Sequence, residues 1–228
     1  MKELIISAGG VNARLRDFLT KEFNGIPKSS LPLPGRKRTL IEEIVYNARP
    51  FFERIQVHAN SQNAHYFLVL FRQLRDVEIV VDNYCTGPVG PQIRSLIERK
   101  ERVYGCAGDF YCDFDWGEFE RFHESHKKPV SIVVAPSISV TDGATFEFNG
   151  DTILSWKRAV QTAKNDVINM GCQIIDYVMD FEDVVEQLQC QFFRTLIGKG
   201  FLKGYKLSRI GFNINTPTAY KALCDHLR

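Results

Sequence analysis

The chain has 228 residues, of which 44% are hydrophobic and 25% are charged, and its formal net charge is +2. This length suffices for one globular domain whose core needs no disulfide or structural metal. The near-neutral charge argues against a nucleic-acid partner, which usually requires a markedly basic face. The apolar runs are too short for a bilayer and the N-terminus lacks a signal-peptide hydrophobic region, so we expect a cytoplasmic protein with no membrane partner.

Basic residues and cysteines are distributed in ways that bear on function. Residues 1–38 hold eight basic residues against three acidic ones, a local excess of +5. Such a cluster suits a small polyanion such as a nucleotide phosphate, although on this feature alone a solvated surface is the commoner explanation. The six cysteines are scattered, with no CxxC pair and no His at zinc-finger spacing. We therefore expect reduced, mostly buried thiols.

Up to residue 110, short apolar segments alternate with amphipathic ones, which is typical of βαβ units and a parallel sheet. Segment 26–35 contains three prolines that exclude a regular helix, so it is an ordered loop over a site or a disordered insertion. The pattern predicts strands at 3–7, 55–59, 77–81 and 102–106, and helices from about Arg14, from the N-cap Thr39 to Pro50, at 63–72 and at 92–99.

The second half has a mixed pattern. Extended segments are expected at 130–135, 137–140, 144–148 and 152–156, with hairpin turns at Asp142-Gly143 and Asn149-Gly150. A helix at 184–197, strands at 201–207 and 209–214, and a closing helix at 217–227 follow.

The loop after the first strand contains Ala8, Gly9 and Gly10. Glycines at this position let backbone N–H groups approach phosphate oxygens, and the N-terminus of the following helix favours negative charge. Arg14 at the helix start is a bidentate phosphate donor. A tight turn without a ligand also explains the two glycines, so further motifs must decide.

Two motifs in fixed order resemble sugar-1-phosphate nucleotidyltransferases. Segment 4–15, an apolar strand followed by Ala-Gly-Gly-Val-Asn-Ala-Arg-Leu, resembles the opening of these enzymes, and Pro27-Lys28-Ser29-Ser30-Leu31-Pro32 resembles their Pro-Lys-x-x-Leu-Pro segment. The resemblance is to the single-domain form without an acyltransferase extension. It implies an α/β fold, namely a Rossmann-like three-layer sandwich of the nucleotide-diphospho-sugar transferase type, with a mostly parallel mixed sheet and helices on both faces.

Four further segments match the family at intervals. They are Thr86–Gly90, which resembles a base-selecting segment, Gly108-Asp109, which resembles a magnesium-binding pair, Asn169–Ile175, which resembles a sugar-pocket strand, and Gly211–Pro217, whose third residue corresponds to a second metal ligand. The resemblance assigns catalysis to Arg14 at the β- and γ-phosphates and Lys28 at the α-phosphate, nucleotide binding to Ala8, Gly9, Gly10, Asn12, Gly87 and Gly90, Mg²⁺ binding to Asp109 and Asn213, and acceptor binding to Lys157 and Gly171.

The implied activity is transfer of a nucleoside monophosphate from a nucleoside triphosphate to a sugar 1-phosphate or similar small phosphate, with release of pyrophosphate. One domain, 1–228, is expected, with a nucleotide-binding half at 1–110 and an acceptor-binding half at 111–228. The base, the acceptor and the oligomeric state stay open, and a homo-oligomer is among the alternatives.

Three departures from the family keep alternatives open: Asn12 replaces a glycine, Asn213 replaces an acid, and Trp156 replaces a glutamate. They leave a catalytically weak homologue that binds nucleotide as a sensor or scaffold as the second reading. An unrelated Rossmann-like oxidoreductase is disfavoured, because the second strand ends in Asn60 where a dinucleotide site needs an acid.

Overall fold

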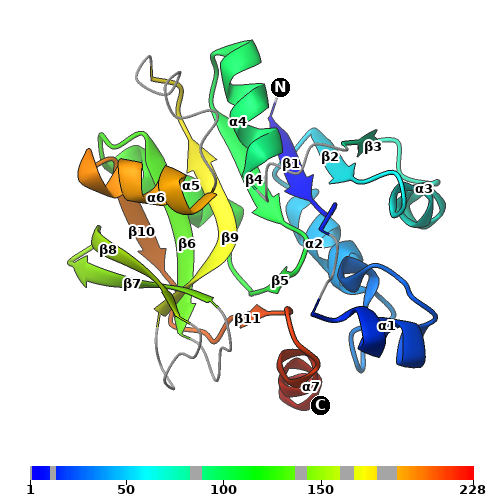
Figure 1. Cartoon of the computed structure of the whole chain (residues 1–228). Helices are drawn as coiled ribbons and strands as arrows, with labels where there is room; N and C mark the ends of the chain where they lie inside the picture. Colours follow the sequence, from blue (N-terminus) through cyan, green and yellow to red (C-terminus); the bar gives the residue numbers. More distant parts are fainter. Residues whose placement is uncertain (1, 11–13, 83–88, 137–142, 160–166, 179–188) are drawn as a thin grey trace.

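A computed structural model describes residues 2–10, 14–82, 89–136, 143–159, 167–178 and 189–228. In the described part of the chain, nine strands form one sheet (Figure 1). Their order across the sheet is β3 (Val77–Val81), β2 (Arg54–Ala59), β1 (Glu3–Ser7), β4 (Val103–Ala107), β9 (Val167–Ile175), β6 (Val130–Pro136), β10 (Leu202–Lys206), β8 (Thr152–Ala159) and β7 (Gly143–Asn149).

Most of these strands run in one direction. β1 pairs parallel with β2 and β4, β2 pairs parallel with β3, and β10 pairs parallel with β6. β9 lies antiparallel between β4 and β6, and β8 is antiparallel to both β10 and β7. The sheet is therefore mixed, as the sequence predicts: most strands run in one direction, and β8 and β9 run in the other.

A closure in the second half is not predicted by the sequence. Thr145 of β7 pairs with Ile168 of β9, so the strands β9, β6, β10, β8 and β7 are joined in a ring of pairings. This half therefore differs from the open sandwich layer formed by β1 to β4.

Helices cover both faces of the sheet. Successive side chains of a strand point to opposite faces, so neighbouring residues of β1 pack against different helices. Leu4 and Ile6 of β1 belong to a core cluster with α2 (Leu40–Ala48), α3 (Ala64–Phe71) and α5 (Trp116–Ser125). Ile5 belongs to a second cluster with α4 (Gly90–Arg99) and α6 (Gln189–Gly198). The helix α2 begins with a capping box in which Thr39 and Glu42 satisfy each other's backbone N–H groups.

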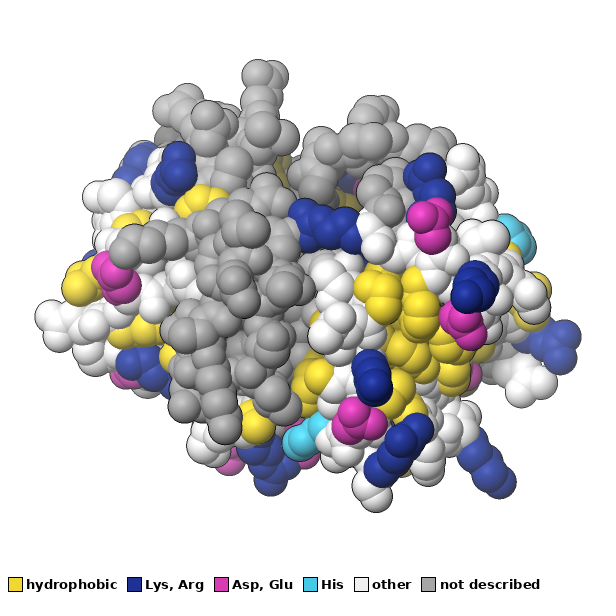
Figure 2. Space-filling view, turned by 60° about the horizontal axis from the view of Figure 1, so that its bottom comes forward, with side chains coloured by type: hydrophobic (Ala, Val, Ile, Leu, Met, Phe, Trp, Pro, Cys, Tyr) yellow, Lys and Arg dark blue, Asp and Glu magenta, His cyan; other side chains and the backbone are white. Residues whose placement is uncertain are grey.

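A third apolar cluster lies at the end of the sheet where β1 and β4 finish. It joins α1 (Arg16–Phe23) and α7 (Pro217–His226) to the short strand β11 (Phe212–Asn213), which pairs with β5 (Phe110–Tyr111). Figure 2 shows this face, on which hydrophobic side chains stay visible among charged ones. The cluster fixes the segments that carry the candidate site.

Most predicted elements are present within a residue or two of their expected bounds. The helix expected from Arg14 begins at Arg16, and the strand expected at 209–214 is reduced to two residues in β11. Helix α5 is an element that the sequence analysis missed, and the extended segment expected at 137–140 lies outside the described residues. No helix among the described residues is long and apolar enough to cross a membrane.

Candidate active site

Lys28 and Asp109 form an ion pair at the carboxyl end of the parallel strands. Lys28 opens the 3-10 turn η1 (Lys28–Ser30), and Asp109 follows β4 by two residues. The Lys28 Nζ atom lies 2.5 Å from Asp109 Oδ2, and the two side chains are only 16% and 17% exposed. Water screens a partly buried pair less than a surface pair, so this contact is electrostatically stronger than an exposed one.

Two asparagines extend the ion pair into a chain of hydrogen bonds. Lys28 Nζ also donates to Asn215 Oδ1 over 2.8 Å, and Asn215 Nδ2 donates to Asn213 Oδ1 over 2.6 Å. The backbone N–H of Ile214 donates to the Asp109 carbonyl oxygen over 2.9 Å. The structure thus brings the predicted residues Lys28, Asp109 and Asn213 together and adds Asn215.

Asn215 is a site residue that the sequence analysis missed. The sequence did contain a signal for it: Asn215 lies two positions after Asn213, and alternate residues of an extended segment lie on the same face. In the resemblance, position 215 is a variable position of the closing motif, so nothing drew attention to it.

The proline-containing segment before α2 is an ordered loop, which settles the alternative that the sequence left open. Leu31 and Leu33 are buried in the third cluster, and Pro32 forms an isolated β-bridge with Thr39. Within the turn, Ser30 N–H donates to the Pro27 carbonyl oxygen over 2.8 Å. The loop is therefore held on both sides of Lys28.

The glycine loop after β1 lies against β2 and Lys28. The Asn60 side chain donates to the Gly9 carbonyl oxygen over 2.8 Å, and a Cβ at Gly9 would stand 3.1 Å from the Asn60 backbone nitrogen. Gly10 is exposed, and a Cβ there would stand 3.9 Å from Lys28 Cε. Buried Ala8 donates its N–H to the His58 carbonyl oxygen. Asn60, the residue after β2, therefore supports the glycine loop. It stands where a dinucleotide site would need an acidic residue.

The other predicted residues are placed as follows. Arg14 is exposed in the turn before α1, and Gly90 is the buried first residue of α4. Lys157 lies in β8, but its side chain is outside the described part of the structure. Asn12 and Gly87 lie outside the described residues.

Part of the basic cluster at 1–38 is neutralised within the fold. Arg36 and Arg38 both form ion pairs with Glu43, whose side chain is only 5% exposed. Lys2 forms an ion pair with Glu120. These cations hold loops on helices, whereas Lys28 contacts the Asp109 carboxylate at the strand ends.

No protein-family profile matches the sequence, and no curated protein is significantly similar to it in sequence. Several solved structures share its fold over nearly the whole chain. A Bacillus anthracis protein assigned as a glucose-1-phosphate thymidylyltransferase, in complex with sucrose, superposes with a TM-score of 0.81 at 13% identity, covering 99% of this chain and 95% of its own. HddC from Yersinia pseudotuberculosis has a TM-score of 0.71 at 20% identity, with 100% of both chains covered.

An inositol-1-phosphate CTP transferase from T. maritima also superposes, with a TM-score of 0.70, 13% identity and coverage of 100% and 96%. The chain has the fold of these nucleotidyltransferases. The resemblance that the motifs indicate is therefore confirmed at the level of the fold.

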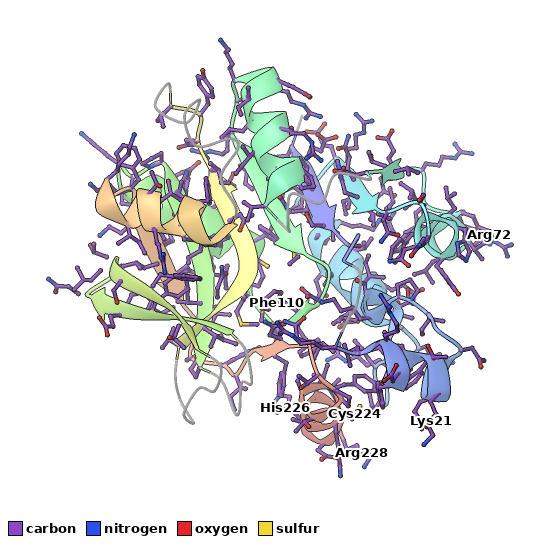
Figure 3. The ribbon with its side chains drawn as sticks, viewed as in Figure 1. Lys21, Arg72, Phe110, Cys224, His226 and Arg228 are labelled. Carbon is purple, nitrogen blue, oxygen red and sulfur yellow. The ribbon has the colours of Figure 1, made fainter. Side chains whose placement is uncertain are left out.

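In this nucleotidyltransferase fold, Gly171 of β9 lies beside the segment that carries Asp109. Its φ is +68°, and a Cβ there would stand 2.7 Å from both Ala107 Cβ and the Phe110 ring. Figure 3 labels Phe110 in β5, between β9 and β11. Only glycine fits this conformation and this space without displacing its neighbours. Gly171 thus allows β9 and β5 to approach closely next to the ion pair.

The oxygen donors at the site fit a hard divalent cation. Among the described residues, no group of three or more His, Cys, Asp or Glu side chains is placed to hold a metal. The site instead offers the Asp109 carboxylate and the amide oxygens of Asn213 and Asn215. Two of these groups, Asp109 and Asn215, already bind one positive charge, the Lys28 ammonium. Mg²⁺ takes few protein ligands and completes its shell with water and substrate phosphates, so this donor set suits it.

Proposed function

We propose that the chain transfers a nucleoside monophosphate from a nucleoside triphosphate to a sugar 1-phosphate or similar small phosphate, as in nucleotide-sugar biosynthesis. The observation that carries this proposal is the Lys28–Asp109 pair with Asn215 and Asn213, at the strand ends of a nucleotidyltransferase fold. Ligands of open α/β sheets bind at the carboxyl ends of the strands, where this pair lies.

The reaction needs no nucleophile from the protein. A phosphate oxygen of the acceptor forms a bond to the α-phosphorus, and the bond from that phosphorus to the bridging oxygen of pyrophosphate breaks. The acceptor phosphate is already ionised at neutral pH, so positioning and charge neutralisation make up the protein's contribution. Lys28 neutralises the α-phosphate and Arg14 binds the outer phosphates. Ala8 anchors the loop to β2 through its N–H, and the backbone N–H groups of Gly9, Gly10 and Asn12 contact phosphate oxygens.

Mg²⁺ is held by Asp109 and Asn213 in this proposal. When bound, it neutralises charge on the phosphate oxygens and orients them. Lys28 releases Asp109 as its ammonium takes a phosphate oxygen, and Asn215 keeps the ammonium in the site during this exchange. The exchange of one anionic partner for another keeps the charge of the site balanced.

The two halves of the domain divide the substrates between them. Residues 1–110 bind the nucleotide, with Gly87 and Gly90 near the base, and residues 111–228 bind the acceptor. Lys157 of β8 contacts the acceptor phosphate, and Gly171 of β9 belongs to the strand that lines the acceptor pocket.

The test is a screen of the common nucleoside triphosphates against a panel of sugar 1-phosphates, with pyrophosphate release as the readout. We expect release with one base and one acceptor class, dependent on Mg²⁺. Nucleotide binding without pyrophosphate release for any pair would contradict the proposal and favour a sensor or scaffold. Calorimetric titration of each nucleotide distinguishes this outcome from an absence of binding.

A further inference from the structure

Two buried thiols face each other across the middle of the sheet. Cys106 of β4 and Cys172 of β9 are direct partners in the antiparallel register, and their sulfur atoms lie 3.3 Å apart. Both residues are almost fully buried, at 3% and 2% exposure, and both are free thiols. Their separation is van der Waals contact, so a small shift of either side chain brings the sulfurs within bonding distance.

A third thiol connects this pair to the surface. Cys112 follows β5, is partly exposed, and borders the same cavity as Cys106 and Cys172. Together the three cysteines line a cavity of about 140 Å³ that Phe110 and Trp116 also border. A water molecule needs roughly 15 Å³ of such space, so the cavity admits a molecule as small as hydrogen peroxide.

We propose that Cys106, Cys112 and Cys172 form an oxidisable three-thiol site, in which Cys112 reacts with hydrogen peroxide and Cys172 then becomes its disulfide partner. The Cys112 sulfur forms a bond to one peroxide oxygen as the O–O bond breaks, giving a sulfenic acid and one water. The Cys172 sulfur then attacks the Cys112 sulfur, and the hydroxyl group leaves as a second water with the Cys172 proton. In sum, two thiols lose two electrons and two protons, and one peroxide is reduced to two waters.

The order of the two steps follows from the solvent exposure and the protonation state of each thiol. Hydrogen bonds with Cys106 and Cys112, together with burial, raise the pKa of the Cys172 thiol well above its ordinary value. Cys172 therefore stays protonated and is a poor first nucleophile. Cys112 is the more accessible thiol, so it meets the oxidant first.

The consequence for activity rests on the proposed function. Cys112 lies three residues after Asp109, and Cys172 directly follows Gly171. A Cys112–Cys172 bond would tie β5 to β9 and draw the Asp109 segment away from its present position relative to Lys28. Because a misplacement of about 1 Å can cost on the order of 10²-fold in rate, we expect oxidation to lower turnover by about tenfold or more, reversibly.

Mass spectrometry of the full chain tests the covalent step without reference to activity. The protein is treated with hydrogen peroxide, digested without reduction, and analysed by fragment-ion sequencing to assign the bonded sulfurs. We expect a Cys112–Cys172 cross-link that disappears on treatment with dithiothreitol. Cys106→Ser should retain it, Cys112→Ser should lose it, and the control Cys224→Ser, at a thiol on α7, should leave it unchanged.

The outcomes separate this inference from the proposed function. No cross-link in the folded wild-type protein, or a cross-link that omits Cys112, overturns the three-thiol site. A cross-link in a protein whose reduced form never releases pyrophosphate leaves the thiol site standing and overturns the proposed function. A cross-link that leaves a measurable turnover unchanged overturns the effect on activity.

Discussion

Lys28 and Asp109 are 81 residues apart in the chain, yet Lys28 Nζ lies 2.5 Å from Asp109 Oδ2. One residue comes from a turn after the first helix and the other from the loop after the fourth strand. Their contact is a long-range feature of the fold, which requires both segments to end at the same edge of the sheet.

Replacing Lys28 by alanine should remove most turnover while the fold persists. The variant lacks the positive charge that, in the proposal, neutralises the α-phosphate. Removing one donor that stabilises a transition state typically lowers kcat on the order of 10²–10³-fold. Steady-state pyrophosphate release measures this. Lys21→Ala is a matched control because that side chain, labelled in Figure 3, is 83% exposed on α1 and should leave kcat unchanged. A Lys28 variant with normal kcat removes this residue from the mechanism.

Replacing Asn215 by alanine should lower kcat by about tenfold with a smaller effect on nucleotide KM. The variant loses the oxygen that holds the Lys28 ammonium and the donor that orients Asn213, but it retains both charges. Kinetics at saturating Mg²⁺ separate kcat from KM. Asn215→Gln keeps the amide and should recover part of the loss. Equal losses in both variants would indicate a packing role only.

Replacing Asn213 by aspartate should lower the Mg²⁺ concentration that gives half-maximal activity, by about tenfold. A carboxylate is a stronger ligand for Mg²⁺ than a neutral amide oxygen, and Asn213 belongs to the same hydrogen-bonded group as Asp109. Activity measured against Mg²⁺ concentration in both proteins provides the comparison. An unchanged midpoint would place the metal away from Asn213.

Replacing Gly171 by alanine should destabilise the protein by about 2–4 kcal/mol, since the new Cβ adds backbone strain at φ +68° and steric overlap with Phe110. Urea denaturation measures the change. Gly150→Ala, with φ +58° but no atom within 4 Å, isolates the backbone strain and should cost about 1 kcal/mol. Gly198→Ala in α6 has neither constraint and should cost nothing. Equal effects at Gly171 and Gly150 would show that close packing is unimportant.

Stability should fall as the pH decreases from about 6.5 to about 4 because of His126. Burial, with the neighbouring His123 and Lys203, lowers the pKa of His126 from 6.5 to about 4, although Asp151 and Asp176 oppose the shift. Between these values the unfolded chain binds more protons at this position than the folded chain, so unfolding is favoured as the pH falls. Its Nδ1 also accepts the Lys128 backbone N–H, which a proton there would prevent.

The size of this effect is on the order of 1 kcal/mol once solvent screening is considered. Urea denaturation at pH 7 and pH 5 measures it. In His126→Gln the difference between the two pH values should shrink by that amount, and an identical difference in both proteins would contradict the assignment. Asp176 affects the pH dependence of stability only below this range. Burial raises the pKa of its carboxyl group, but hydrogen bonds from His123 and Arg102 outweigh burial and lower the pKa to about 2.

Local sequence signals account for the elements that were predicted well. An apolar run that ends in small residues predicts the strand β1 and the glycine loop. Thr39 and Glu42 form the capping-box pattern that predicts the start of α2. Helix α5 was missed, even though Asp115 caps it by accepting the Glu118 N–H. Its first turn contains Gly117, a poor helix former, and aromatic residues that are equally frequent in strands.

The rest depends on contacts that local patterns do not encode. The pairing of Thr145 with Ile168 joins strands from separate segments, and neither strand's own sequence specifies it. The resemblance to a family pointed to Lys28, Asp109 and Asn213, whereas Asn215 became evident only through its hydrogen bonds. The cysteines are scattered along the sequence, and only the sheet register shows that Cys106 and Cys172 lie side by side.

The anchored loop around Lys28 has a consequence for the thermodynamics of nucleotide recognition. Lysine side chains lose up to about 2 kcal/mol of rotamer entropy when they are fixed. Here that loss occurs during folding, because Asp109 and Asn215 already hold the ammonium before any phosphate arrives. A triphosphate entering this site thus meets an ammonium that is already positioned, so binding does not include the entropy cost of ordering the lysine side chain. The cost that remains is the exchange of the Asp109 contact for a phosphate oxygen.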